Sequence, residues 1–281
     1  MAVTEFTKFH IDEFKNYLIN EERAGATVEK YVRDVETFLA CLPGRIEITK
    51  ERVLAYKKQL AEKYKSTSAN SMLVALNQFF TFWHRDDLKV RLFKVQRTSF
   101  RENNRELTLA EYRQLVYAAK ARKNERLSMM IQTICSTGIR VSEHRFITVE
   151  ALKRGSIRIS NKGKERVIFL TKKLNRVLGL YCRKKGITSG PIFVTKTGKP
   201  MNRCNIWAQM KALCADAGID PQKVFPHNLR HLFALTYYRL EKDIVRLADI
   251  LGHASIETTR IYTTTTAEEC MRTLSRLNLL I

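Results

Sequence analysis

The chain has 281 residues, of which 44% are hydrophobic and 28% charged, a composition typical of a globular protein and unlike that of a disordered or fibrous chain. No apolar run approaches the roughly 20 residues of a membrane span, and MAVTEFTKFHIDEF lacks the order of a signal peptide, so we expect a cytoplasmic protein. Lys and Arg outnumber Asp and Glu by 50 to 28, and the formal net charge of +22 favours nucleic acid as a partner.

Residues 1–97 are predicted to form a small domain of four helices. Apolar side chains recur at helical spacing within residues 6–18, 31–39, 53–60 and 72–83. Turn residues separate these stretches. Residues 98–106 are polar, lack any period and are predicted to be a linker.

A second domain is predicted over residues 107–266, mainly α-helical with a small antiparallel β-sheet. Thr108 and Glu111 have the spacing of a helix capping box. Residues 156–170 change to the alternation of a β-hairpin, with Ile157 and Ile159 on one strand and Val167 and Phe169 on the other. PIFVTKTGKPM is a shorter strand-turn-strand candidate, and helices resume near Asn202.

Two stretches of the second domain present cations. In STGIRVSEHR, Gly138 ends an apolar helix and Arg140 follows, where a guanidinium can bind a phosphate. Lys162 and Lys164 lie at the hairpin tip, where an ammonium group can act as a general acid. Taken singly, each stretch also has an ordinary structural interpretation: the first as a solvent-exposed arginine after a helix end, the second as a solvent-exposed turn.

Two further stretches present titratable rings. In FPHNLRHLFALTYYRL, His227 and Arg230 fall on one helical face, while the adjacent His231 is equally compatible with the helix surface. In LGHASIETTRIY, Gly252 ends a helix, His253 follows and Tyr262 lies nine residues further on. A phenol is a poor nucleophile at neutral pH unless cations surround it.

Taken together, these motifs resemble the active site of the tyrosine recombinases, the phage integrase family, close to its Xer-type branch. The shared features are T-G-x-R-x-x-E, a lysine-tipped hairpin, H-x-L-R, L-G-H and a tyrosine nine residues later, in that order. The similarity covers about residues 106–266. The helical N-terminal region fits the core-binding domain of the family in size and place, but carries no specific motif.

The resemblance implies a site-specific DNA recombinase. Tyr262 would attack a DNA phosphodiester and form a 3′-phosphotyrosyl link, and His227 would assist proton transfer. Lys162, with Lys164 as the alternative, would protonate the leaving oxygen. The residues that would stabilise the transition state are Arg140, Arg230 and His253.

The resemblance also implies double-stranded DNA as the partner, a homotetramer on two DNA sites and a nucleoid-associated location, and it leaves open an accessory DNA-bending protein. No cofactor and no metal are expected, because the arginines replace the cation, no P-loop motif occurs and the six cysteines lie far apart. Integration, excision, inversion and resolution all remain open. A DNA-binding accessory protein without catalysis and a type IB topoisomerase are the alternative functions.

Two positions depart from the family pattern. His144 follows the glutamate of T-G-x-R-x-x-E, where an apolar residue is usual, and it either alters packing under Arg140 or adds a DNA contact. YYRLEKDIVRLAD lacks the glycine that Xer-type proteins commonly have between two helices. The tail, residues 267–281, has apolar side chains at helical spacing, and we expect it to dock either on its own domain or on a neighbouring protomer.

Overall fold

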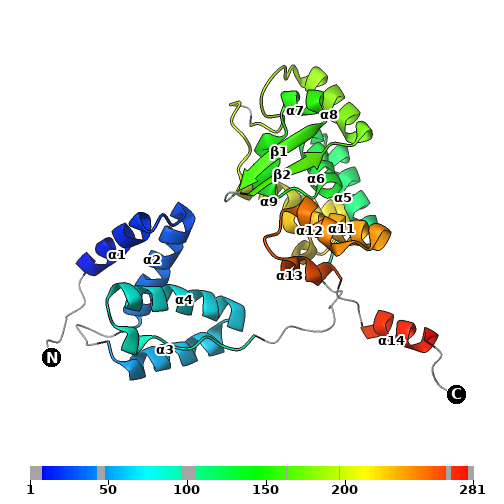
Figure 1. Ribbon diagram of the computed structural model, residues 1–281. Helices are drawn as coiled ribbons and strands as arrows, with labels where there is room; N and C mark the ends of the chain where they lie inside the picture. Colours follow the sequence, from blue (N-terminus) through cyan, green and yellow to red (C-terminus); the bar gives the residue numbers. More distant parts are fainter. Residues whose placement is uncertain are drawn as a thin grey trace. The chain divides into compact units, whose positions relative to one another are not determined.

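A computed structural model describes residues 8–42, 48–95, 105–161, 164–195, 197–263 and 267–277. The chain divides into two compact units, Met1–Arg97 and Thr98–Ile281 (Figure 1). Among the described residues, no helix combines the length and the apolarity that crossing a membrane requires.

In its described residues, the first unit contains the four predicted helices and one short 3-10 helix. Phe14, Phe38 and Phe79 are fully buried in its core, at positions that the helical periodicity had placed on apolar faces. The helices α2 and α4 contact each other, and α1 and α3 pack against this pair. The bounds are α1 Lys8–Asn20, α2 Gly25–Ala40, α3 Lys50–Lys63, α4 Ser66–Phe82 and η1 Asp86–Leu88.

The second unit is mainly helical, as predicted, and the part of it that the structure describes has one two-stranded antiparallel sheet. Its α5 begins with the predicted capping box, in which Thr108 N–H donates to Glu111 Oε2 (2.7 Å) and Glu111 N–H donates to Thr108 Oγ1 (3.2 Å). Its elements are α5 Leu109–Ala121, α6 Glu125–Thr137, η3 Val141–Phe146, α7 Val149–Arg154, β1 Ser156–Asn161, β2 Lys164–Phe169, α8 Lys172–Lys185, α9 Arg203–Ala212, α10 Cys214–Ala217, η4 Pro221–Lys223, α11 Pro226–Glu241, α12 Ile244–Leu251, α13 Ile256–Thr259, η5 Arg260–Tyr262 and α14 Ala267–Arg276.

The hairpin lies where the alternation predicted it, but the second strand presents the other set of residues to the core. In the register of the pair, Ile157 faces Ile168, and both are buried. Val167 is 42% exposed and Phe169 is 76% exposed, so these two side chains lie on the outer face. The strand holds three consecutive apolar residues, and only pairing with β1 decides which of them point inward.

The segment PIFVTKTGKPM folds back on itself as expected, but without full strands. Among the described residues, Val194 and Pro200 form an isolated antiparallel bridge, and Thr195 N–H donates to Lys199 O (2.8 Å) and Met201 N–H to Phe193 O (3.2 Å). Two of its eleven residues are proline, which cannot donate a hydrogen bond to a neighbouring strand.

The helices α11 and α12 are separate although no glycine divides them. Lys242 adopts a left-handed conformation (φ +57°), and its N–H donates to Tyr238 O, which closes α11. Asp243 then caps α12, because its Oδ1 accepts the N–H of Arg246 (2.9 Å). The two helices contact each other (Figure 1); His227 and Arg230 lie in α11, and His253 follows the end of α12.

Candidate active site

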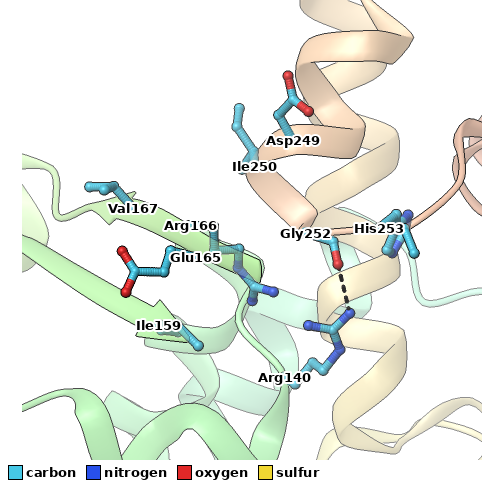
Figure 2. A pocket seen from close by; sticks show the side chains of 10 residues that line it. Arg140, Ile159, Glu165, Arg166, Val167, Asp249, Ile250, Gly252 and His253 are labelled. Atoms are coloured by element: carbon cyan, nitrogen blue, oxygen red, sulfur yellow. Dashed lines mark hydrogen bonds between the residues drawn. The ribbon is translucent and has the colours of Figure 1, made fainter. Parts of the chain in front are cut away.

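Arg140 is held in place by the residues around the end of α6. Gly138 ends this helix with φ +65°, and a Cβ there would lie 2.4 Å from the Phe233 ring, so the turn requires glycine. Arg140 N–H donates to Glu143 Oε2 (2.7 Å), and Nη1 donates to Oε1 of the same carboxylate (3.1 Å). Its Nη2 donates to Gly252 O (3.2 Å; Figure 2).

Arg230 is the most deeply buried cation of the site, with 2% of its surface exposed. It comes from α11 and donates to Gly138 O (2.6 Å), to Leu251 O (2.7 Å) and to His253 Nε2 (3.1 Å). Burial, together with the charge of Arg140, lowers the pKa of Arg230 to about 10, so it is still cationic at neutral pH. Among the described residues, no carboxylate pairs with this guanidinium.

His253 follows Gly252, which ends α12 in the left-handed conformation as predicted. An arginine can only donate, so Nε2 of His253 accepts from Arg230 and the ring proton lies on Nδ1, which donates to Thr259 Oγ1 (2.8 Å). Burial and the charge of Arg230 lower the pKa of His253 to about 4, so the ring is neutral at neutral pH. A hydroxyl both donates and accepts, so Thr259 supports either ring tautomer.

Tyr262 lies in η5 and is 3% exposed. Leu235 of α11 and Leu251 of α12 belong to the apolar cluster that surrounds it. Its ring lies 4.9 Å from the ring of His231 and 6.3 Å from that of His253, measured between centroids. Burial raises the pKa of the phenol, and the nearby charge of Arg230 acts in the opposite direction. The phenol is therefore protonated at neutral pH.

His227 lies in the first turn of α11, one residue after Pro226, and is exposed. Desolvation and the charge of Arg230 lower its pKa. Lys162 lies outside the described residues, and so does the side chain of Lys164, the first residue of β2. The hairpin lysines therefore stay predictions, whereas Arg140, Arg230, His253 and Tyr262 form one connected cluster.

Sequence reasoning missed several residues of this cluster. His231 contacts Glu106 (3.0 Å between Nε2 and Oε1) as well as the Tyr262 ring, although Glu106 had been assigned to the linker. Thr259 is fully buried against His253, and Arg166 pairs with Glu143. No local signal was available for Arg166, because its place on the buried face follows from its pairing with the buried Ile159.

His144, the departure from the family pattern, is buried (4% exposed) beside Glu143. Its Nδ1 lies 2.5 Å from Val141 O, and burial lowers the pKa of the ring. Of the two roles considered, a packing role fits this position, because a buried ring is not available to DNA in this structure.

A pocket of about 690 Å³ opens beside this cluster. Arg140, Arg166 and His253 line it, and Figure 2 shows the carboxylates of Glu165 and Asp249 directed away from Arg140. Glu143 is the carboxylate that pairs with both Arg140 and Arg166. With Arg230, the cluster thus holds three arginines but only one carboxylate among the described residues that pairs with any of them, and the excess positive charge favours an anion.

We expect the thermal stability of the chain to fall as the pH drops from about 6.5 towards 4. The folded pKa of His253 is about 4 against an ordinary 6.5, so the unfolded chain binds more protons in this window and the free energy of unfolding falls as the pH falls. Above pH 6.5 the ring is neutral in both the folded and the unfolded chain, so it no longer makes the free energy of unfolding depend on pH. Melting temperatures measured between about pH 4 and 6.5 test this expectation. His253→Gln should flatten the slope, and an unchanged slope would contradict the assignment.

The fold and the cluster together define a protein that places a phenol beside a group of buried and partly buried arginines. The model of the phage integrase family matches residues 105–269, and that of the phage integrase N-terminal SAM-like domain matches residues 11–86. The chain belongs to the phage integrase family, which confirms the resemblance seen in the motifs.

Two curated relatives are Xer-type recombinases. The chain is 29% identical to tyrosine recombinase XerA of Pyrococcus furiosus over 96% of this chain and 94% of the relative. It is 30% identical to tyrosine recombinase XerD of Vibrio cholerae over 74% of each. Among solved structures, a lambda integrase tetramer bound to a Holliday junction shares the fold, with a TM-score of 0.71, 18% identity and coverage of 92% of this chain and 78% of that one.

Proposed function

We propose that the chain is a site-specific DNA recombinase that cleaves and rejoins strands through Tyr262. The phenolic oxygen attacks a DNA phosphorus, the bond from phosphorus to the 5′-oxygen breaks, and a 3′-phosphotyrosyl link forms. The phenol loses its proton and the leaving 5′-oxygen gains one. The 5′-hydroxyl of a partner strand then attacks this link, releases the tyrosine and completes the exchange. The covalent link conserves the energy of the phosphodiester bond.

The observation that carries this proposal is the convergence of Arg140, Arg230 and His253 on one cluster with Tyr262. In the attack, negative charge builds on the non-bridging oxygens of the phosphate. Fixed guanidinium groups in a partly buried site stabilise such charge more strongly than water does. Arg230 is already oriented by two backbone carbonyls, so little reorganisation is needed when a phosphate arrives.

We assign the proton transfers to side chains at the edge of the cluster. His227 is exposed, and its lowered pKa leaves it neutral and able to accept a proton. Lys162 or Lys164 of the hairpin is proposed to protonate the 5′-oxygen. His253 donates to a phosphate oxygen only with its proton on Nε2, and the Thr259 hydroxyl then donates to Nδ1.

We propose double-stranded DNA as the partner and a homotetramer on two sites as the working assembly. The net charge of +22 and the lambda integrase tetramer on a Holliday junction, which has the same fold, support this proposal. A nucleoid location follows from such a role. An accessory DNA-bending protein is needed only if purified chain and DNA alone fail to recombine.

The test of the proposal is the topology of the products. DNA sequences selected for binding to the full chain are placed as pairs on a supercoiled plasmid, and the products are mapped. We expect deletion or inversion between the two sites. Relaxation without exchange would favour a type IB topoisomerase, and binding with no change in the DNA would favour the accessory protein.

The helix α14 is proposed to dock on a neighbouring protomer. Met271, Leu274 and Leu277 follow one another at helical spacing and are more than half exposed, at 62%, 54% and 53%. An exposed apolar stripe of this kind favours burial against a protein surface.

Replacing both Met271 and Leu274 by Asp should lower recombination by about tenfold or more, since buried interface anchors dominate association. Binding to a single site should persist. Gel electrophoresis of two-site complexes measures the assembly, and Arg272→Ala on the same helix is the control. If the double variant instead lowers the melting temperature of the free chain, the tail packs on its own domain.

A further inference from the structure

Arg166 occupies an unusual position on the hairpin. It pairs with Ile159 in the register of the two strands and therefore lies on the buried face, together with Ile157 and Ile168. Its side chain is 8% exposed. Figure 2 shows it directed from β2 towards Gly252 and Arg140. A cation at such a position carries a desolvation penalty, which is the largest cause of its lowered pKa.

Stability does not account for this arginine. An apolar side chain of similar size in place of a buried ion pair is often neutral or stabilising. The hydrogen bonding of Arg166 is also incomplete, because its buried Nε has no partner among the described residues. Its one hydrogen bond to a carboxylate, from Nη2 to Glu143 Oε2, is 2.6 Å long.

Glu143 links Arg166 to the candidate phosphate site. This carboxylate is 5% exposed, and both of its oxygens are engaged. Oε2 accepts from Arg166 and from the N–H of Arg140, while Oε1 accepts from Arg140 Nη1. Without Arg166, the carboxylate would be held from the Arg140 side alone. Arg166, which lies on a different element from Arg140, is therefore a second support of this carboxylate.

Arg166 also contacts the turn that carries His253. A Cβ on Gly252 would lie 2.5 Å from Arg166 Nη1 and 2.7 Å from its Cδ, so the arginine packs directly on this glycine. The carbonyl of the same residue accepts from Arg140 Nη2. Arg166 thus touches both supports of the Arg140 guanidinium, namely Glu143 and the Gly252 peptide.

We propose that Arg166 is a positioning residue for strand cleavage, which acts by holding Glu143 and the Gly252 turn so that the Arg140 guanidinium is aimed at the scissile phosphate. The catalytic part of this proposal rests on the recombinase function proposed above.

The first experiment measures covalent adduct formation on a nicked duplex and on the same duplex with sulfur in place of the bridging 5′-oxygen. A thiolate leaves without being protonated, so the second substrate bypasses the hairpin acid. Arg166→Met should slow both substrates about a hundredfold, the effect expected of a misplaced catalytic group. Arg158→Ala, an exposed arginine on β1, should react normally. If Arg166→Met forms the adduct at the wild-type rate on the sulfur substrate, then Arg166 orients the hairpin acid, and the proposal is overturned.

A double-mutant comparison asks whether Arg166 acts through Arg140. The variant with both arginines replaced by Met should be no slower than Arg140→Met alone, because Arg166 has nothing left to position. Fully additive losses would overturn the proposal. Arg166→Lys keeps the charge and the bond to Glu143, so it should recover part of the rate even if Arg166→Met folds poorly.

A second measurement does not require any reaction. The N–H of Arg140 donates to Glu143, so its hydrogen exchange reports the position of that carboxylate. Exchange at Arg140 should accelerate in Arg166→Met, accelerate less in Arg166→Lys, which keeps the bond to Glu143, and stay unchanged in Arg158→Ala. Unchanged exchange in the Arg166 variants would overturn the positioning role. If the wild-type chain forms no adduct, the recombinase function fails, and this exchange still decides whether Arg166 positions Arg140.

Discussion

Replacement of Tyr262 by phenylalanine is expected to abolish the covalent protein–DNA adduct completely. Phenylalanine keeps the ring that fills the cluster around Leu235 and Leu251, so the fold should be retained. The only atom removed is the oxygen that would attack phosphorus. Removal of a nucleophile, unlike removal of a stabilising group, leaves no residual route to the same covalent intermediate.

The measurement for Tyr262→Phe is the yield of a protease-sensitive adduct after a denaturing quench, on a nicked duplex that carries a selected site. Tyr237→Phe is the matched control, because Tyr237 packs against the same cluster and should give the wild-type adduct. An adduct that persists in Tyr262→Phe would assign the nucleophile to another residue. Linkage to a 5′ end of the DNA would contradict the proposed chemistry.

The second large effect is expected at Arg230. Arg230→Met should slow cleavage by about a thousandfold or more, because it removes a fixed charge and its donors from the position where negative charge develops. The side chain lies inside the site, with 2% exposure, so solvent does not compensate for its loss. Arg230→Lys keeps the charge but lacks the planar fork that reaches both Gly138 O and Leu251 O, and should be intermediate.

The effect of Arg230→Met on stability should be smaller than its effect on rate. The substitution leaves two buried carbonyls without their donor, which is destabilising. It also removes an unneutralised buried cation, which is stabilising. The rate of adduct formation and the melting temperature, measured on the same samples, separate the two quantities. Arg239→Met, an exposed arginine of the same helix, is the control. A rate that fell only in proportion to the folded fraction would contradict a direct role for Arg230.

Local physical signals in the sequence predicted much of this structure. The helices of the first unit followed from apolar periodicity, and the start of α5 followed from one capping box. Gly138 and Gly252 marked the two helix ends that precede Arg140 and His253. Each of these features depends on residues within one or two helical turns, so it can be predicted from residues that are neighbours in the sequence.

Only the tertiary structure decided which face of β2 is buried, and with it the role of Arg166. Val167, Ile168 and Phe169 are all apolar, so alternation alone allows either Ile168 or the pair Val167 and Phe169 to face the core. The hydrogen bonds to β1 decide between these two arrangements. The partnership of His231 with Glu106 joins residues 125 positions apart, which no local pattern indicates.

The sequence by itself determined the order and spacing of the motifs, and their resemblance to the family predicted six candidate site residues. The tertiary structure decided their connections: Arg230 to His253, Arg140 to Gly252 and Arg166 to Glu143. These contacts exist because α6, α11, α12 and the hairpin bury their apolar faces against one another. The burial that brings the cations together also removes them from water, and this makes their charge available to a phosphate.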